Sequence, residues 1–203
     1  MTILYLVRHA VTEHTGKKLS GWMEDIPLSD EGRGEALAVA ERLSDQKLDA
    51  VFSSPIDRTL QTAQPIAERH DLPIATSKAL GEVEYGKWTD RSLKVLARTK
   101  LWAQVQRWPS AARFPDGETL REVQVRVVGE IERIVGEYPR GRVCVVSHGD
   151  PIKLICAHYL GVHIDLFQRI VVAPASVSVV AVSGSGPAIL ALNSLSGPVA
   201  SGA

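Results

Sequence analysis

The stretch RVCVVSHGD, residues 142–150, decides the fold of this chain. Its apolar run from Val143 to Val146 predicts a strand that is buried on both faces. Gly149 and Asp150 follow directly, and apolar residues then recur at helical spacing from Pro151 to Leu160, which predicts a helix. A buried strand that leads straight into a helix is typical of an α/β sheet.

Outward from this unit, apolar runs and segments of helical period alternate along most of the chain. Strands are predicted at 3–7, 49–53, 74–76, 170–173, 177–182 and 188–192. Helices are predicted after Ser29 as far as Asp45, at 58–70, at 88–108, and from Asp116 or Thr119 to Tyr138, the last being the longest. The alternation predicts an α/β fold, a three-layer sandwich with a mostly parallel central sheet flanked by helices.

The length of 203 residues suits one domain with a substantial core. We expect a single catalytic domain over residues 1–193 and a flexible tail over residues 194–203. The loop RWPSAARFPDG, which follows the helix-like stretch, makes the region near 88–118 a candidate lid.

Charge and composition limit the classes of partner. Lysine plus arginine and aspartate plus glutamate each number 23, so no overall field attracts nucleic acid or a membrane surface, and affinity for an anion must be local. The start MTILYLVRHA lacks the features of a secretion signal, which predicts a cytoplasmic protein. Cys144 and Cys156 are predicted to be buried free thiols. The oligomeric state stays open, with a homodimer as one option.

Polar residues follow three of the predicted strands. Arg8 and His9 follow the first strand, Arg58 comes shortly after the second, and His148 and Gly149 follow the buried strand. Ligand sites in open α/β sheets form at the carboxyl ends of strands, so we expect these residues to converge. Two imidazoles and two guanidiniums supply a nucleophile and a charge clamp for a phosphoryl group, and the helix that begins at Gly149 adds backbone N–H groups.

Four motifs, LVRHA (6–10), SSPIDRTLQTA (53–63), LGEVEYG (80–86) and VSHGD (146–150), occur in this order, with SGWMEDIPLSDEG (20–32) between the first two. In these motifs the chain resembles the histidine phosphatase superfamily, which has the phosphoglycerate-mutase-like fold. The resemblance spans nearly the whole chain. It implies that His9 accepts the phosphoryl group, that Glu82 donates a proton, and that the substrate is a small phosphorylated molecule handled without metal or other cofactor. The phosphate pocket that it implies contains Arg8, Thr12, Ser20, Gly21, Arg58 and His148.

The chemistry of these residues agrees with that assignment. A neutral imidazole is a competent nucleophile near neutral pH if its second nitrogen donates a proton to a fixed acceptor, so His9 needs such a partner. A carboxyl group beside a bound dianion has its pKa raised and can protonate the leaving oxygen. Glu84 is the alternative acid, but in an extended segment it faces away from Glu82, and the motif register favours Glu82.

The chain departs from the family pattern at two pocket positions. Ala10 stands where relatives usually have glycine, and Thr15 stands where many have an asparagine that contacts phosphate. The effect of both on the phosphate pocket is left open. Trp88-Thr89-Asp90 also replaces the more usual Trp-Glu-Gly, which alters the loop and not the acid.

The remaining histidines and the tryptophans are predicted to have structural roles, and two loop arginines are left between two interpretations. His14, His70, His158 and His163 are predicted at the surface or at helix ends, and the tryptophans, Trp88 among them, in packing roles. Arg107 and Arg113 flank the candidate lid, where contact with an anionic substrate and simple solvation are equally compatible with the pattern.

The sequence thus predicts a metal-independent phosphatase that hydrolyses small phosphomonoesters through a phosphohistidine. Its runner-up is a phosphoglycerate-type mutase, which the short segment between Glu82 and His148 disfavours. A phosphate-binding regulatory module without turnover and a metallohydrolase that uses the same histidines are the alternatives from other classes. The physiological substrate is left open.

Overall fold

The computed structural model describes residues 1–200, which form one six-stranded sheet with strand order β3-β2-β4-β1-β5-β6. The strands are β1 (Thr2–Arg8), β2 (Ala50–Ser53), β3 (Ile74–Thr76), β4 (Arg142–Ser147), β5 (Val177–Ser183) and β6 (Gly186–Ser194). The first four pair in parallel, and β5 runs antiparallel to both β1 and β6. The predicted α/β class with a mostly parallel sheet is confirmed.

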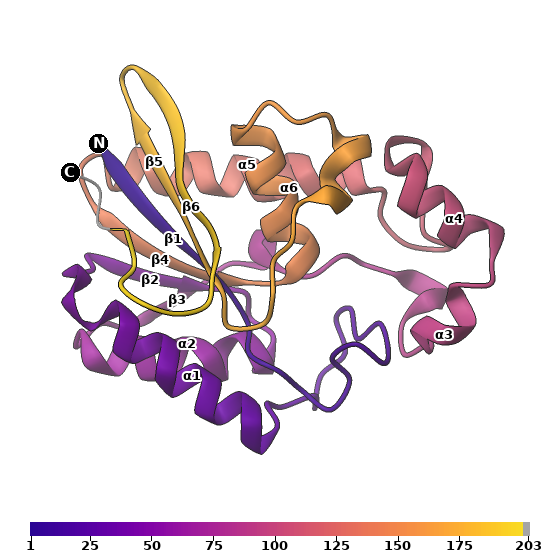
Figure 1. Ribbon diagram of the computed structural model, residues 1–203, viewed down its shortest axis with the longest axis horizontal. Coiled ribbons are helices and arrows are strands. Elements are labelled where there is room, and N and C mark those ends of the chain that lie inside the picture. Colours follow the sequence, from indigo (N-terminus) through magenta and orange to yellow (C-terminus); the bar gives the residue numbers. More distant parts are fainter. Residues whose placement is uncertain (201–203) are drawn as a thin grey trace.

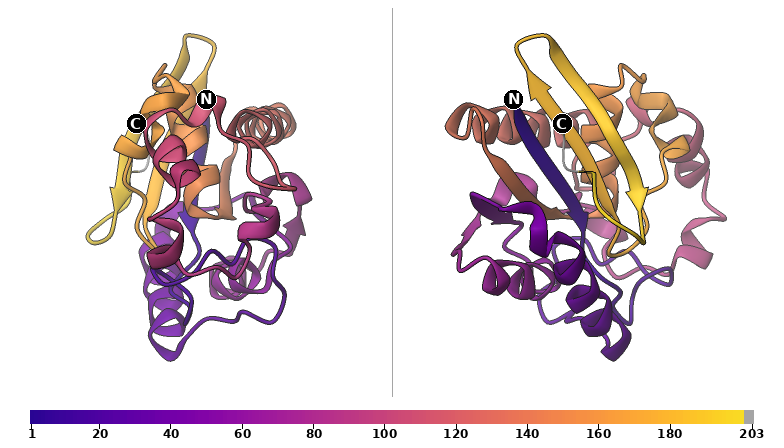
Figure 2. Two further views of the ribbon diagram at one scale, coloured as in Figure 1. Left: turned by 90° about the vertical axis from the view of Figure 1, so that its right-hand side faces the viewer. Right: turned by 60° about the vertical axis from the view of Figure 1, so that its left-hand side comes forward.

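Helices cover both faces of this sheet (Figures 1 and 2). One face is covered by α1 (Asp30–Leu43) and α2 (Asp57–Arg69), and the other by α5 (Leu120–Glu137) and α6 (Gly149–Tyr159). Two short helices, α3 (Leu93–Leu96) and α4 (Lys100–Arg107), lie apart from the sheet, at the right of Figure 1. The arrangement is the expected three-layer sandwich.

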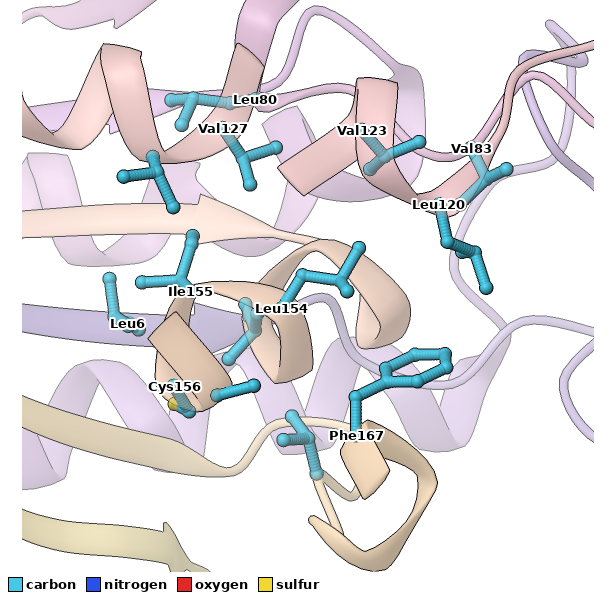
Figure 3. Close-up of a cluster of buried hydrophobic side chains, with 14 of the residues drawn as sticks. Leu6, Leu80, Val83, Leu120, Val123, Val127, Leu154, Ile155, Cys156 and Phe167 are labelled. Atoms are coloured by element: carbon cyan, nitrogen blue, oxygen red, sulfur yellow. The ribbon is translucent and has the colours of Figure 1, made fainter. Parts of the chain in front are cut away.

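The alternation of side chains along the strands divides the core in two. In β1, Leu4 and Leu6 face the cluster beneath α5 and α6, whereas Tyr5 and Val7 face the cluster beneath α1 and α2. Figure 3 shows part of the first cluster, where Leu6 and residues of α5 and α6 pack together. Because β1 and its neighbours are buried on both faces, their carboxyl ends are rigid supports for side chains.

Caps fix where the flanking helices begin. The Ser29 side chain accepts a hydrogen bond from Gly32 at the start of α1, as its position in the sequence predicts. Of the two predicted starts for the long helix, Thr119 is the one used, since it forms a capping box with Glu122. Pro65 lies inside α2 without ending the helix.

Two predicted elements are wrong. The stretch 88–108 is not one helix, because Asp90 has a φ of 62° and Thr99 caps a new helix, α4. The predicted strand 170–173 is absent from the described residues, because its polar backbone groups pair with side chains: Arg8 donates to Val172, and Ala173 donates to Asn193.

The segment 194–200, predicted as part of a flexible tail, makes specific contacts with the first helical layer. Arg42 of α1 donates hydrogen bonds to the carbonyls of Ser194 and Gly197. Val199 is only 5% exposed and packs among the residues beneath α1 and α2. Residues 201–203 of that predicted tail lie outside the described residues.

Two further findings bear on the sequence predictions. Cys144 and Cys156 are free and buried, as predicted. Within residues 1–200, no helix has both the length and the apolar character needed to cross a bilayer.

Candidate active site

The carboxyl ends of β1, β2 and β4 meet at one edge of the sheet. Because β4 pairs with both β1 and β2, Arg8 lies opposite Ser147, and Ser53 lies opposite Val146. A pocket of about 320 Å³ opens there, a size that suits a small metabolite. The sequence-predicted residues that line it are Arg8, His9, Thr12, Ser20, Gly21, Arg58, Glu82 and Gly149. The predicted convergence of the strand ends is confirmed.

His9 is held in the tautomer that a nucleophile needs. Its Nδ1 lies 2.8 Å from the carbonyl oxygen of Ala10, which can only accept, so Nδ1 carries the proton. Nε2 is therefore left with a free lone pair. Burial lowers the pKa of His9 well below its usual value, and the charges of Arg58 and Arg8 lower it further. The imidazole is neutral at physiological pH.

Two buried guanidinium nitrogens near His9 have no hydrogen-bond partner within the described residues. They are Nε of Arg8 and Nη1 of Arg58. The other end of each guanidinium is anchored: Arg8 donates to Val172 at 2.7 Å, and Arg58 donates to Gly21 at 2.7 Å. Buried donors are almost always paired, so two orphan cationic donors in one pocket indicate a site built for an anion.

His148 lies behind this pocket and not on its wall. Its Nδ1 lies 3.3 Å from Nη2 of Arg58, and its Nε2 lies 2.9 Å from Oγ of Ser54. Arg58 can only donate, so Nδ1 accepts and the neutral ring donates from Nε2 to Ser54. Its ring centroid is 5.2 Å from that of His9. The geometry makes His148 a support for Arg58, and direct contact with phosphate stays a prediction.

Of the two candidate acids, Glu82 lines the pocket, whereas the side chain of Glu84 is exposed and does not. Burial and then the nearby charge of Asp150 raise the pKa of Glu82 to about 7, although a hydrogen bond from the Val83 amide opposes the shift. A carboxyl group of this pKa is present in both protonation states near neutral pH.

Two helices begin beside the pocket without a side-chain cap. They are α2, preceded by Ile56, and α6, preceded by His148. The α-carbon of Gly149 packs close to the guanidinium of Arg8, since a β-carbon there would lie 3.3 Å from its central carbon. Uncapped amides at helix starts favour an anion, which adds to the two arginines.

The two departures from the family pattern have simple structural accounts. Ala10 is fully buried, and its φ is not in the positive range that would favour glycine. The hydroxyl of Thr15 lines the pocket and accepts a hydrogen bond from the backbone of Thr12 at 2.9 Å. Thr15 therefore stabilises the loop that carries Thr12, whatever it contributes to phosphate binding.

Several pocket residues were not singled out by the sequence. His14 was predicted at the surface, but it lines the pocket and lies 3.2 Å from Oγ of Ser20. The candidate lid contributes a mostly apolar wall, made of Leu93, Trp102, Val105, Gln106 and Phe114. The helix α6 and the segment that follows it contribute a polar wall, made of Asp150, Lys153 and Gln168. The sequence predicted a lid in the region 88–118, but helical periodicity marks its positions only as amphipathic and does not show which side chains reach the pocket.

Arg107 and Arg113 are not among the pocket residues. Arg113 pairs with Glu122 at 2.7 Å, which favours a surface role for Arg113 over contact with an anionic substrate. Trp88 is buried against Phe114, as predicted, whereas Trp102 reaches the pocket. Across residues 1–200, no group of three or more histidine, cysteine, aspartate or glutamate side chains is arranged to hold a metal ion.

Comparison with known proteins agrees with this geometry. The family model of the histidine phosphatase superfamily (branch 1) matches residues 4–195. The chain belongs to this superfamily. A protein similar to it is phosphoserine phosphatase 1 of Hydrogenobacter thermophilus, 32% identical over 196 residues, which are 95% of this chain and 92% of the relative.

Other proteins are similar to this chain over comparable lengths. A probable phosphoglycerate mutase of Cronobacter sakazakii is 28% identical over 88% of this chain and 84% of its own. The solved structure of Bacillus stearothermophilus YhfR superimposes with a TM-score of 0.91 at 24% identity, covering 97% of this chain and 98% of that one. This likeness confirms the fold.

Proposed function

We propose that this histidine phosphatase hydrolyses small phosphomonoesters through a phosphohistidine on Nε2 of His9. The observation that carries the proposal is the pair of unpartnered donors, Nε of Arg8 and Nη1 of Arg58, beside a neutral imidazole whose free nitrogen is defined. They supply fixed positive charge for the oxygens of a phosphoryl group, which is what a loose phosphoryl-transfer transition state requires.

In the first step, Nε2 of His9 attacks phosphorus and the bond from phosphorus to the ester oxygen breaks. The departing oxygen takes the proton of the Glu82 carboxyl group, so the alcohol leaves uncharged. Arg8 and Arg58 hold the equatorial oxygens, and the N–H at Nδ1 of His9 stays on the Ala10 carbonyl, which stabilises the charged phosphohistidine.

In the second step, the Glu82 carboxylate takes a proton from water while the water oxygen attacks phosphorus. The bond from phosphorus to Nε2 breaks, which releases inorganic phosphate and restores neutral His9 and protonated Glu82. A pKa of about 7 suits Glu82 to both roles, since it loses and regains its proton at little cost near neutral pH.

The candidate lid is the part of the protein that we propose to determine which phosphomonoester is hydrolysed. Side chains of the region 88–118, among them Trp102 and Val105, form an apolar part of the pocket wall. We assign recognition of the alcohol part of the substrate to this region, within a single catalytic domain over residues 1–193. A cytoplasmic location is part of the same proposal.

The test is release of inorganic phosphate from p-nitrophenyl phosphate and from a panel of phosphometabolites, measured with and without EDTA. We expect turnover that the chelator leaves unchanged. A phosphoglycerate substrate separates the runner-up, because a mutase would yield the isomer without free phosphate. No phosphate release from any substrate would favour the regulatory module, and loss of activity in EDTA would favour the metallohydrolase.

The raised pKa of Glu82 predicts the pH dependence of the reaction. With an alkyl phosphate, kcat/KM should fall as pH rises through about 7, because the free enzyme then loses the proton that the leaving alkoxide needs. With p-nitrophenyl phosphate, whose leaving group departs as the anion, the decline should be much smaller. Both profiles are measured from about pH 6.5 to about pH 9, where the substrates stay dianionic. Equal profiles for the two substrates would contradict the role of Glu82.

A further inference from the structure

Arg126, on α5, does not line the pocket. All five of its N–H groups nevertheless donate hydrogen bonds to residues close to the pocket. Nη1 donates to the carbonyls of Ala79 and Gly81, both at 2.9 Å. Nη2 donates to the carbonyl of Glu82 at 2.8 Å and to Oε2 of Glu118 at 2.9 Å, and Nε donates to Oε1 of Glu118 at 2.7 Å. The guanidinium thus has its full set of hydrogen bonds.

Three of the acceptors belong to the short segment that carries Glu82. Carbonyl dipoles that converge on one point repel each other unless a cation lies between them, and Arg126 supplies that cation. The Glu82 carbonyl also accepts a hydrogen bond from Nε1 of Trp22 at 2.7 Å. Because two donors hold its carbonyl, the Glu82 backbone has a fixed orientation, and its side chain lines the pocket.

Glu118 extends this hold to the other side of Glu82. Its Oε2 accepts a hydrogen bond from the Glu84 amide at 2.9 Å, and its own amide donates to the Glu84 carbonyl at 2.9 Å. The approach is so close that a β-carbon on Gly117 would lie 2.1 Å from the Glu84 carbonyl oxygen. Arg126 and Glu118 are 21% and 16% exposed, so water screens their pairing only in part.

We propose that Arg126 and Glu118 are a positioning pair that holds the general acid Glu82 against the substrate's leaving oxygen. Neither side chain lines the pocket, so both act through the backbone on either side of Glu82. The inference rests on the proposed function, in which Glu82 is the acid and Arg8 and Arg58 bind the phosphoryl group. It assigns the pair to the support of the acid and not to phosphate binding.

The test compares R126K and R126M with the unaltered protein on an alkyl phosphate and on p-nitrophenyl phosphate, with kcat/KM as the readout. A displaced acid slows only the substrate that needs protonation. We expect R126M to lower kcat/KM at least about tenfold on the alkyl phosphate and less than about threefold on p-nitrophenyl phosphate. R126K should lose nearly as much as R126M, since one ammonium cannot serve three carbonyls and a carboxylate.

The matched control is R133M, on the same helix, where the arginine is half exposed and pairs with Glu130 and Glu137 of α5. It should leave both substrates unchanged. E118Q serves as the second variant should R126M fold poorly, and we expect the same substrate split from it. Equal slowing of both substrates, or full activity in R126K, would overturn the positioning role.

Failure of the proposed function is a separate outcome of this experiment. If the unaltered protein released no phosphate from either substrate, the proposed function would fail, and no comparison of variants would be needed. If the unaltered protein hydrolysed both substrates and R126M slowed them equally, the phosphatase would stand and only the positioning role would fall.

Discussion

Replacing His9 with alanine should abolish phosphate release and leave no phosphoryl group on the protein. The expected loss is at least about a thousandfold in kcat, because the nucleophile is removed while the arginines still bind the substrate. His148, whose ring centroid is 5.2 Å from that of His9, cannot serve as a substitute. His148 has both ring nitrogens engaged, one with Arg58 and the other with Ser54.

The measurement is steady-state phosphate release together with rapid quenching after exposure to a radiolabelled substrate. The unaltered protein should carry a label that acid removes and base does not, as expected of a phosphohistidine. His158→Ala is the matched control, since His158 is exposed on α6 and does not line the pocket. Labelling or rapid turnover in His9→Ala would place the nucleophile elsewhere.

The parts of this site that chain pattern alone predicted lie close to strand ends, whereas the motifs of the resemblance were needed for Glu82 and the loop residues. Arg8, His9 and Gly149 each lie within three residues of the end of an apolar run, and a parallel sheet brings the ends of such runs to one edge. Arg58, the second residue of α2, is fixed almost as firmly. These positions follow from local pattern together with one topological rule.

The details of the site that sequence could not predict depend on contacts between distant segments. His148 follows a strand as His9 does, yet its nitrogens face Arg58 and Ser54, and only side-chain packing decides this. Arg126 has the pattern of an ordinary helix-surface arginine, and its partners are 8 to 47 residues away along the chain. The hydrophobic periodicity of the sequence does not reveal such pairings.

The two errors in predicted elements have the same origin. Val172 belongs to an apolar, β-branched run that suits a strand, but the Arg8 side chain takes its carbonyl. Asp90 looks acceptable within a helical period, but its backbone is left-handed and its side chain pairs with Lys18 at 2.8 Å. In each case a tertiary contact overrides a weak local preference.

Replacing Glu82 with glutamine should separate the two chemical steps. The amide keeps the size of the carboxyl group but cannot give up a proton to an alkoxide, so kcat/KM for an alkyl phosphate should fall by about a hundredfold or more. For p-nitrophenyl phosphate, kcat/KM should change little, because it reports only the steps through transfer to His9. The decline of activity through about pH 7 should also vanish, since the group of raised pKa is gone.

The second step gives Glu82→Gln a further signature that His9→Ala cannot share. Water attack on the phosphohistidine also needs the Glu82 carboxylate, so kcat for p-nitrophenyl phosphate should fall and labelled protein should accumulate, as a burst of nitrophenol followed by slow turnover. Glu84→Gln is the matched control two residues away, where the side chain is exposed and its backbone remains held by Glu118. Should Glu84→Gln, and not Glu82→Gln, produce the burst, the acid and base would be Glu84, and the pocket wall would have to rearrange to admit it.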